Sequence, residues 1–107
     1  MQVEVIYWRD IPAQCTARIG RKRQGMPLSE RFERAIDRCA MKVGAKDSDA
    51  YLREWRRVAL SPEDAGEGEA KEVLERVSAR LEAEYDNARL RSLIERDGFE
   101  SPQSSSS

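Results

Sequence analysis

The hydrophobic positions near the start of the chain follow the period of a β-strand. The segment Val3 to Trp8 is rich in β-branched and aromatic residues, which strands favour. Successive side chains of a strand point to opposite faces, so Ile6 and Trp8 share one face, and the other face carries Val3, Val5 and Tyr7. Because both faces are apolar, we expect this strand to be covered on both sides or to lie at the centre of a sheet.

A second strand follows after a turn. Residues 9–12 interrupt the apolar run, and Pro12, which fixes φ and has no N–H group, is typical of a turn or a strand edge. The alternation then resumes from Ala13 to Ile19, with Ala13, Cys15, Ala17 and Ile19 facing inward. The two strands form a hairpin. Because an isolated hairpin is marginal in water, it needs a third strand, helices or a second copy, and a homodimer is one expectation.

The residues after the hairpin indicate a link and a first helix. Gly20 to Pro27 is a basic, flexible link, and Ser29 is a typical N-cap. Apolar residues then recur at helical spacing from Phe32 to Val43, with arginines on the opposite side. Gly44 is a natural C-terminal stop.

Two further helices are predicted. Asp47 or Ser48 caps a short one that ends at Ser61-Pro62, and its apolar side consists of Tyr51, Leu52, Trp55, Val58 and Ala59. A long acidic helix runs from about Glu69 to about Asp97 and ends at Gly98.

These elements predict an α+β fold in which an N-terminal β-hairpin packs on three helices, the last one long. Residues 1–60 form the hairpin and a two-helix core, residues 61–98 the long acidic helix of the same domain, and residues 99–107 a disordered, serine-rich tail. The length of 107 residues suits one domain.

The charge is unevenly distributed along the chain. Residues 1–60 carry 13 Lys and Arg against 8 Asp and Glu, and residues 61–107 carry 6 against 12, although the net charge is only −1. Two explanations remain open. Either the halves pair within one fold, or the first half presents a basic face to an acidic partner.

The composition argues against several classes of site. The chain has no histidine, and its two cysteines, Cys15 and Cys39, lie on apolar positions far apart, so we expect no metal site. A nucleophile has no histidine to activate it, and the glycines do not have phosphate-loop spacing. We therefore expect no cofactor and no enzymatic activity. The absence of a signal peptide and of an apolar run of membrane-spanning length predicts a cytoplasmic protein that does not enter a membrane.

A basic cluster is the strongest surface signal. Arg21, Lys22 and Arg23, together with Arg18, lie at the exit of the hairpin. Such a cluster attracts a phosphate backbone, but single-strand binding also uses exposed aromatic side chains. Trp8 and Trp55 are spaced as core anchors, and the alternative is that they are hot spots of a protein interface.

A longer motif gives a family resemblance. The run Tyr7-Trp8-Arg9-Asp10-Ile11-Pro12-Ala13-Gln14 is followed by Arg31-Phe32, Ala35-Ile36-Asp37-Arg38, Ala40-Met41, Tyr51-Leu52 and Trp55-Arg56-Arg57. Over about residues 3–60 the chain resembles the small bacterial domain known as virulence factor, which is similar to a segment of the longer conserved virulence factor C proteins. The resemblance implies a bacterial cytoplasmic accessory protein and brings no catalytic residues. It also implies an association with one-carbon and methyl-transfer metabolism.

The motif has two physical interpretations. In one, Arg9 to Pro12 fix the turn, and Arg9 reaches Asp37 or Glu33 on the first helix as a structural latch. In the other, the turn is a recognition loop held by a rigid scaffold.

The leading functional hypothesis is a non-catalytic accessory or adaptor that binds another protein through the hairpin turn and the basic surface. The residues proposed for this contact are Trp8, Arg9, Asp10, Arg21, Lys22 and Arg23. One alternative is a nucleic-acid-binding protein that uses the basic patch. The other is an accessory subunit in one-carbon metabolism.

Overall fold

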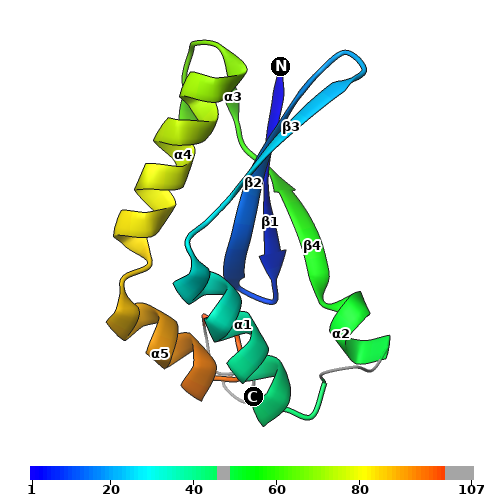
Figure 1. The fold of residues 1–107 in the computed structure, drawn as a ribbon, viewed down its shortest axis with the longest axis vertical. Helices are drawn as coiled ribbons and strands as arrows, with labels where there is room; N and C mark the ends of the chain where they lie inside the picture. The colour runs from blue at the N-terminus through cyan, green and yellow to red at the C-terminus, as the bar shows by residue number, and fades with distance from the viewer. Residues whose placement is uncertain (46–48, 101–107) are drawn as a thin grey trace.

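The computed structural model describes residues 1–45 and 49–100. An antiparallel sheet has the strand order β3-β2-β1-β4 (Figure 1). Its strands are β1 (Gln2–Trp8), β2 (Ile11–Ile19), β3 (Lys22–Pro27) and β4 (Trp55–Ala59). The helices in the described part of the chain are α1 (Glu30–Lys42), α2 (Asp49–Arg53), α3 (Pro62–Ala65), α4 (Ala70–Glu84) and α5 (Asn87–Glu95). The predicted α+β class is confirmed.

The N-terminal hairpin is present and β1 lies inside the sheet, as its two apolar faces predict. On one side it pairs with β2, and on the other with β4. The register with β2 shifts once, between Ile6 and Tyr7, while the pairing with β4 is regular. The turn between β1 and β2 contains Arg9 in a left-handed conformation, with φ of 55°.

The predicted link after the hairpin is wrong, because most of it forms β3. The chain turns at Gly20, whose φ is +60°, and residues 22–27 then pair with β2. Without β3, the outer edge of β2 would present unpaired N–H and C=O groups. Pairing with that edge stabilises residues 22–27 as a strand, although a polar segment has a weak strand propensity. Charged residues and a proline are typical of an exposed edge strand.

The predicted second helix is also wrong over most of its length. Of the described residues in this segment, only those of α2 are helical, and residues 55–59 form β4 against the free side of β1. The helical spacing did not reveal this long-range pairing. Leu52, expected on the apolar side, is 68% exposed. The caps proposed at Asp47 and Ser48 lie outside the described residues.

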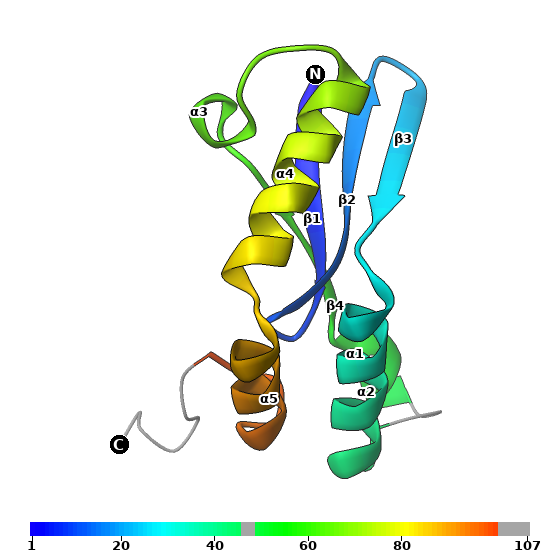
Figure 2. The same cartoon turned by 60° about the vertical axis from the view of Figure 1, so that its left-hand side comes forward.

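The predicted long helix divides into α4 and α5. At Tyr85 the backbone leaves the helical region, with φ of −105° and ψ of 71°. The side chain of Asp86 then accepts a hydrogen bond from the backbone N–H of Arg89 at 2.8 Å and caps α5. This break lets α5 pack beside α1, while α4 lies along β2 and β3 (Figures 1 and 2).

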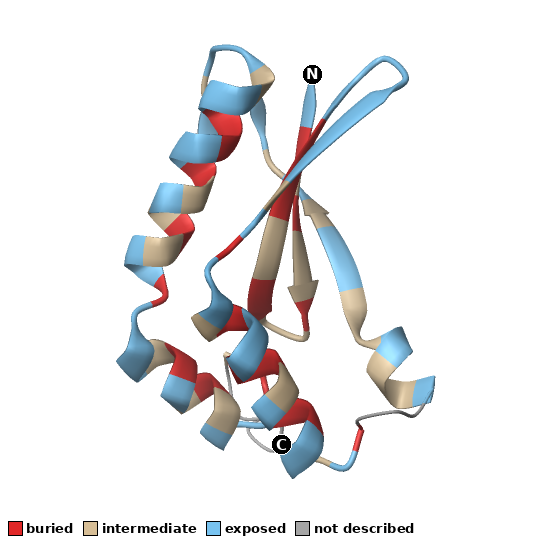
Figure 3. Ribbon diagram, in the orientation of Figure 1, coloured by how far each residue is buried: buried red, intermediate tan, exposed pale blue. Residues whose placement is uncertain are grey.

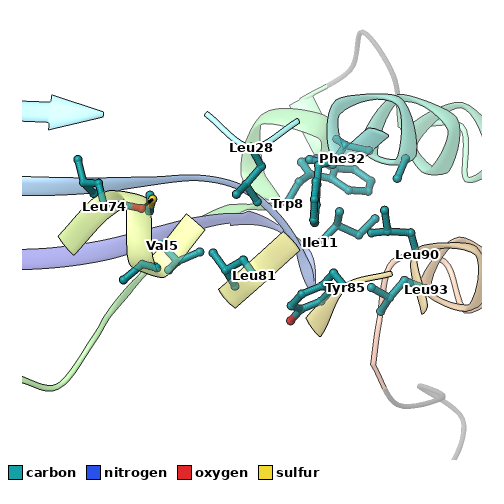
Figure 4. Close-up of a cluster of buried hydrophobic side chains, with 14 of the residues drawn as sticks. Val5, Trp8, Ile11, Leu28, Phe32, Leu74, Leu81, Tyr85, Leu90 and Leu93 are labelled. Carbon is teal, nitrogen blue, oxygen red and sulfur yellow. Dashed lines mark hydrogen bonds between the residues drawn. The ribbon is translucent and has the colours of Figure 1, made fainter. Parts of the chain in front are cut away.

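The core lies between the sheet and the helices. The buried positions follow the side of α4 that faces the strands and the contact between α1 and α5 (Figure 3). Figure 4 shows its central part, which extends from Leu74 and Val5 to Trp8 and Phe32. The thiol of Cys15 lies 3.7 Å from the backbone carbonyl oxygen of Leu74 and ties β2 to α4.

The two oppositely charged halves contact each other through ion pairs. Arg31 on α1 pairs with Glu82 on α4 at 3.0 Å, and Lys42 pairs with Asp97 at 2.9 Å. Part of the charge asymmetry is therefore used inside the fold. Phe99 and Glu100, expected in the tail, contact Arg9 and Arg89 respectively, and residues 101–107 lie outside the described part.

Candidate functional site

The β1–β2 turn is closed by the C-terminal segment. The guanidinium of Arg9 lies 5.1 Å from the ring centre of Trp8 and 4.8 Å from that of Phe99. It donates a hydrogen bond to the backbone carbonyl of Asp97 and lies 3.5 Å from a carboxylate oxygen of Glu54. Arg9 therefore does not pair with Asp37 or Glu33, and this expectation is wrong. The local sequence pattern could not identify Asp97 as a partner, because it lies 88 positions away.

Asp10 holds the same two regions together. One of its carboxylate oxygens accepts a hydrogen bond from Arg56 of β4 at 2.7 Å, and the other accepts one from the backbone N–H of Glu100 at 2.7 Å. The backbone N–H of Asp10 donates to the carbonyl of Gly98 at 2.8 Å. These bonds engage the groups that a recognition loop would present, and the geometry is that of a latch.

The six proposed contact residues do not form one surface. Trp8 is completely buried, and its indole N–H donates to the backbone carbonyl of Tyr51 at 3.0 Å. Arg21, Lys22 and Arg23 are exposed at the β2–β3 turn. The nine residues of β2 separate that turn from Arg9 and Asp10 by about 30 Å. Trp8 cannot touch a partner in this fold.

The sheet face that carries Ile6 and Gln14 is hollowed. A cavity of about 320 Å³ lies where this face meets α1 and α2, and Trp55, Tyr51, Glu33 and Asp37 line it. The ring centres of Tyr51 and Trp55 are 5.9 Å apart with planes at 85°, so the rings form two walls of a corner. The two carboxylates lie one helical turn apart on α1.

A second hollow, of about 550 Å³, continues from the first along the sheet. Ile6, Arg56 and Arg57 line it, and Gln14 and Trp55 belong to both hollows. Arg57 lies 3.7 Å from a carboxylate oxygen of Glu4 on the same face. We call the two hollows together the Trp55 groove. The partly exposed Trp55 lies in its middle, between an acidic end and a basic end.

A different groove lies between α1 and α5. Its volume is about 360 Å³, its floor is apolar, and arginines surround it. We call it the arginine groove, and its lining residues are Arg31, Arg34, Ala35, Arg38, Asn87, Leu90, Arg91 and Ile94. The first helix therefore carries its acidic side toward the Trp55 groove and its basic side toward the arginine groove.

The buried thiols do not have the character of nucleophiles. Burial raises the pKa of Cys15, and burial also raises the pKa of Cys39, although the nearby Arg9 opposes that shift. A thiol with a raised pKa stays protonated at neutral pH and is a weak nucleophile. Within the described residues, no three Cys, Asp or Glu side chains are grouped closely enough to hold a metal ion.

The family model described as "Virulence factor" matches residues 6–94. The chain belongs to the virulence factor family. The match extends beyond the residues that carry the resemblance in the sequence, because it includes α4 and nearly all of α5. Searches of the curated proteins and of the solved structures return no match.

The residue pattern along the chain indicates some of these positions but not others. It indicates Trp55 as a potential hot spot but predicts a helix there, whereas Trp55 begins β4. It does not indicate Arg91, nor that Glu33 and Asp37 line one hollow, although carboxylates at i and i+4 of a helix are a detectable signal because like charges at that spacing repel each other.

Among the described residues, none of the helices has the length and apolar character that a membrane span requires.

Proposed function

We propose that this virulence factor domain is a non-catalytic accessory protein that binds another protein through the Trp55 groove. The observation that carries the proposal is the position of Trp55, a partly exposed tryptophan that lines two adjoining hollows. Tryptophan and arginine are enriched among the residues that contribute most to protein interfaces. Here Arg57, two residues along β4, lies on the same face of the sheet as the tryptophan.

The surface expected from the sequence was the hairpin turn with its basic exit. The bonds of Arg9 and Asp10 to residues 97–100 favour a structural role for the turn, and the burial of Trp8 removes it as a contact. The proposal therefore keeps the protein partner and moves the contact to the neighbouring face. The buried, unpaired cysteines suit a cytoplasmic location, which is part of the proposal.

The chemistry of the Trp55 groove indicates the kind of segment it accepts. Glu33 and Asp37 have no hydrogen-bond or ion-pair partner for their carboxylates among the described residues, and the faces of Tyr51 and Trp55 attract cations. A lysine or arginine side chain of the partner would pair with these carboxylates and pack against these aromatic rings. At the other end, Arg57 would favour an acidic or carbonyl group.

The alternative of single-strand nucleic-acid binding gains no support from these positions. The exposed basic cluster at the β2–β3 turn and the aromatic walls at Trp55 belong to different regions of the fold. Base stacking and phosphate contacts need both kinds of side chain along one path.

The test is capture of partner proteins by the tagged full chain from a lysate of the source cells. Trp55→Ala should reduce recovery of the partner by about tenfold, the effect of a typical interface hot spot. The matched control is the double variant Arg21→Ala/Arg23→Ala, which should capture the partner as the wild type does. Equal recovery with Trp55→Ala, or loss only with the control, would overturn the proposal.

A second variant protects the test against misfolding. Gln14→Lys places a charge between the two hollows without removing core atoms, and it should also abolish capture. Circular dichroism and thermal melting establish that each variant is folded. Mass spectrometry of the captured protein then separates a methyl-transfer enzyme, which the one-carbon alternative predicts, from other partners.

A further inference from the structure

We infer that the arginine groove between α1 and α5 is a second docking site, and that its occupant is an acidic amphipathic helix of a partner protein. This inference is independent of the Trp55 groove, because it rests on the opposite side of α1. The sequence indicated arginines on one side of that helix. Only the fold brings Arg91 of α5 to the same hollow.

The four arginines differ in how firmly they are held. Arg31 is fixed, because it pairs with Glu82, donates to the backbone carbonyl of Tyr85 and lies 4.5 Å from the ring centre of Phe32. Arg34 pairs with Glu30 at 3.0 Å, but both side chains are 79% exposed, and such pairs contribute little. Arg34 therefore remains available to a partner.

Arg38 and Arg91 are available without any exchange of partners. Neither guanidinium has a hydrogen bond or ion pair within the part of the chain that the structure describes, and both side chains belong to exposed residues. They project from different helices into one hollow. Arg31, Lys42, Arg56 and Arg89 form ion pairs within the chain, whereas Arg38 and Arg91 have no such partner among the described residues and lie beside an apolar floor.

The apolar floor favours a helix as the occupant. Ala35, Leu90 and Ile94 line the hollow between two packed helices, and a third helix can place a row of apolar side chains into such a groove. Carboxylates beside that row would meet the arginines, which bind carboxylates through two parallel hydrogen bonds. Nucleic acid is disfavoured because the lining contains no aromatic side chain for stacking.

A second copy of the chain is a poor source for this helix. The acidic helix α4 buries its apolar residues Val73, Leu74, Val77 and Leu81 in its own core. These apolar residues could enter the groove of another copy only if α4 left the sheet. The occupant is therefore a helix of another protein.

The inference is tested by NMR titration of the isotope-labelled full chain with a synthetic peptide. The peptide has about 18 residues, with leucines at i, i+3, i+4 and i+7 and glutamates beside them. Amide shifts should concentrate on α1 and α5, around Ala35, Leu90 and Ile94. A peptide of the same composition in scrambled order should bind about tenfold more weakly, because it has the charge without the apolar row.

Variants assign the contact to the unpaired arginines. The double variant Arg38→Ala/Arg91→Ala should bind the peptide about tenfold more weakly, whereas Arg18→Ala/Arg21→Ala, which removes the same charge at the β2–β3 turn, should bind it as the wild type does. Arg38→Lys/Arg91→Lys should lie between them, because lysine keeps the charge without the planar fork.

Three results would overturn the inference. The shifts could concentrate at residues 21–23, the groove variant could bind with wild-type affinity, or a single-stranded oligonucleotide could displace the peptide from the groove at equal concentration. Failure of this test would leave capture through Trp55 unaffected, since the two grooves share no lining residue.

Discussion

The carboxylate of Glu82 on α4 accepts two hydrogen bonds from Ser29, one from the backbone N–H at 2.7 Å and one from the hydroxyl at 2.9 Å. Ser29 is the N-cap of α1, yet its side chain makes no capping bond to its own helix. Glu82, 53 positions along the chain, thus accepts the hydrogen bonds of the residue that begins α1. The guanidinium of Arg31 also donates to the Glu82 carboxylate, at 3.0 Å. This contact fixes the helix that separates the two grooves.

This arrangement makes stability depend on pH. Burial by itself raises the pKa of Glu82, but the hydrogen bonds from Ser29 and Arg31 outweigh that effect and lower it below the usual range. A lowered pKa in the folded state stabilises the protein above the unfolded-state pKa, near 4.3. That stabilisation is lost as the pH falls through the lower, folded-state value.

We predict that Glu82→Gln reduces the free energy of unfolding at pH 7 by about 1–3 kcal/mol, because it removes charge-assisted hydrogen bonds. The difference from wild type should shrink as the pH falls through the folded-state pKa. Urea unfolding at pH 7 and at successively lower pH measures both quantities. A difference that stays constant down to full protonation of the carboxylate would contradict the account.

The latch at the hairpin turn depends on Gly98. Its φ is +92°, and an added Cβ would lie 2.9 Å from Cδ of Arg9 and 3.2 Å from Sγ of Cys39. Gly98→Ala should therefore reduce the free energy of unfolding by about 2–4 kcal/mol, because it strains the backbone and displaces the Arg9 side chain. At Gly20, φ is +60° and an added Cβ would have no neighbouring atom within 4 Å. Gly20→Ala should therefore reduce the free energy of unfolding by only about 1 kcal/mol. Thermal melting of both variants provides the comparison, and equal losses would remove Gly98 from the latch.

The break between α4 and α5 depends on the Asp86 cap. Asp86→Ala should reduce the free energy of unfolding by about 1 kcal/mol, the usual effect of losing an N-cap. Asp86→Asn keeps the acceptor and should lose only a small part of that amount. Guanidinium unfolding measures the difference. If both variants lose the same stability, the charge of Asp86 rather than its hydrogen bond to Arg89 supports the helix start.

The local patterns predicted the elements that form from neighbouring residues. The hairpin, the start of α1 at Ser29 and its stop at Gly44, whose φ is +71°, follow from alternation, capping and backbone freedom. The alternation along β1 also predicted which residues share a face. Val5 and its partner Val58 lie on one face of the sheet, and Trp8 and its partner Trp55 lie on the other.

The remaining elements depend on distant partners. Residues 55–59 have helical spacing, but pairing with β1 makes them a strand, and residues 22–27 become one because β2 offers an open edge. Both grooves combine side chains from elements distant in sequence. The hydrophobic period of one segment therefore could not predict them, whereas the basic side of α1 was visible.

The two tryptophans should differ in fluorescence. In the Trp55→Phe chain only the buried Trp8 emits, and in the Trp8→Phe chain only the partly exposed Trp55 emits. We predict weaker acrylamide quenching for Trp8 than for Trp55. The Trp8→Phe variant must first be shown to be folded by circular dichroism, because it loses the hydrogen bond to Tyr51. Stronger quenching of Trp8 would contradict its position in the core.

The claim that the Trp55 groove binds a partner protein is tested most directly by site-specific photo-crosslinking in the source cells. A photoreactive phenylalanine analogue replaces Gln14, which lines both hollows of the groove, or Arg21 at the β2–β3 turn as the control. The account predicts a discrete, heavier adduct with another protein from position 14 and none from position 21. An adduct from position 21 together with none from position 14 would contradict it.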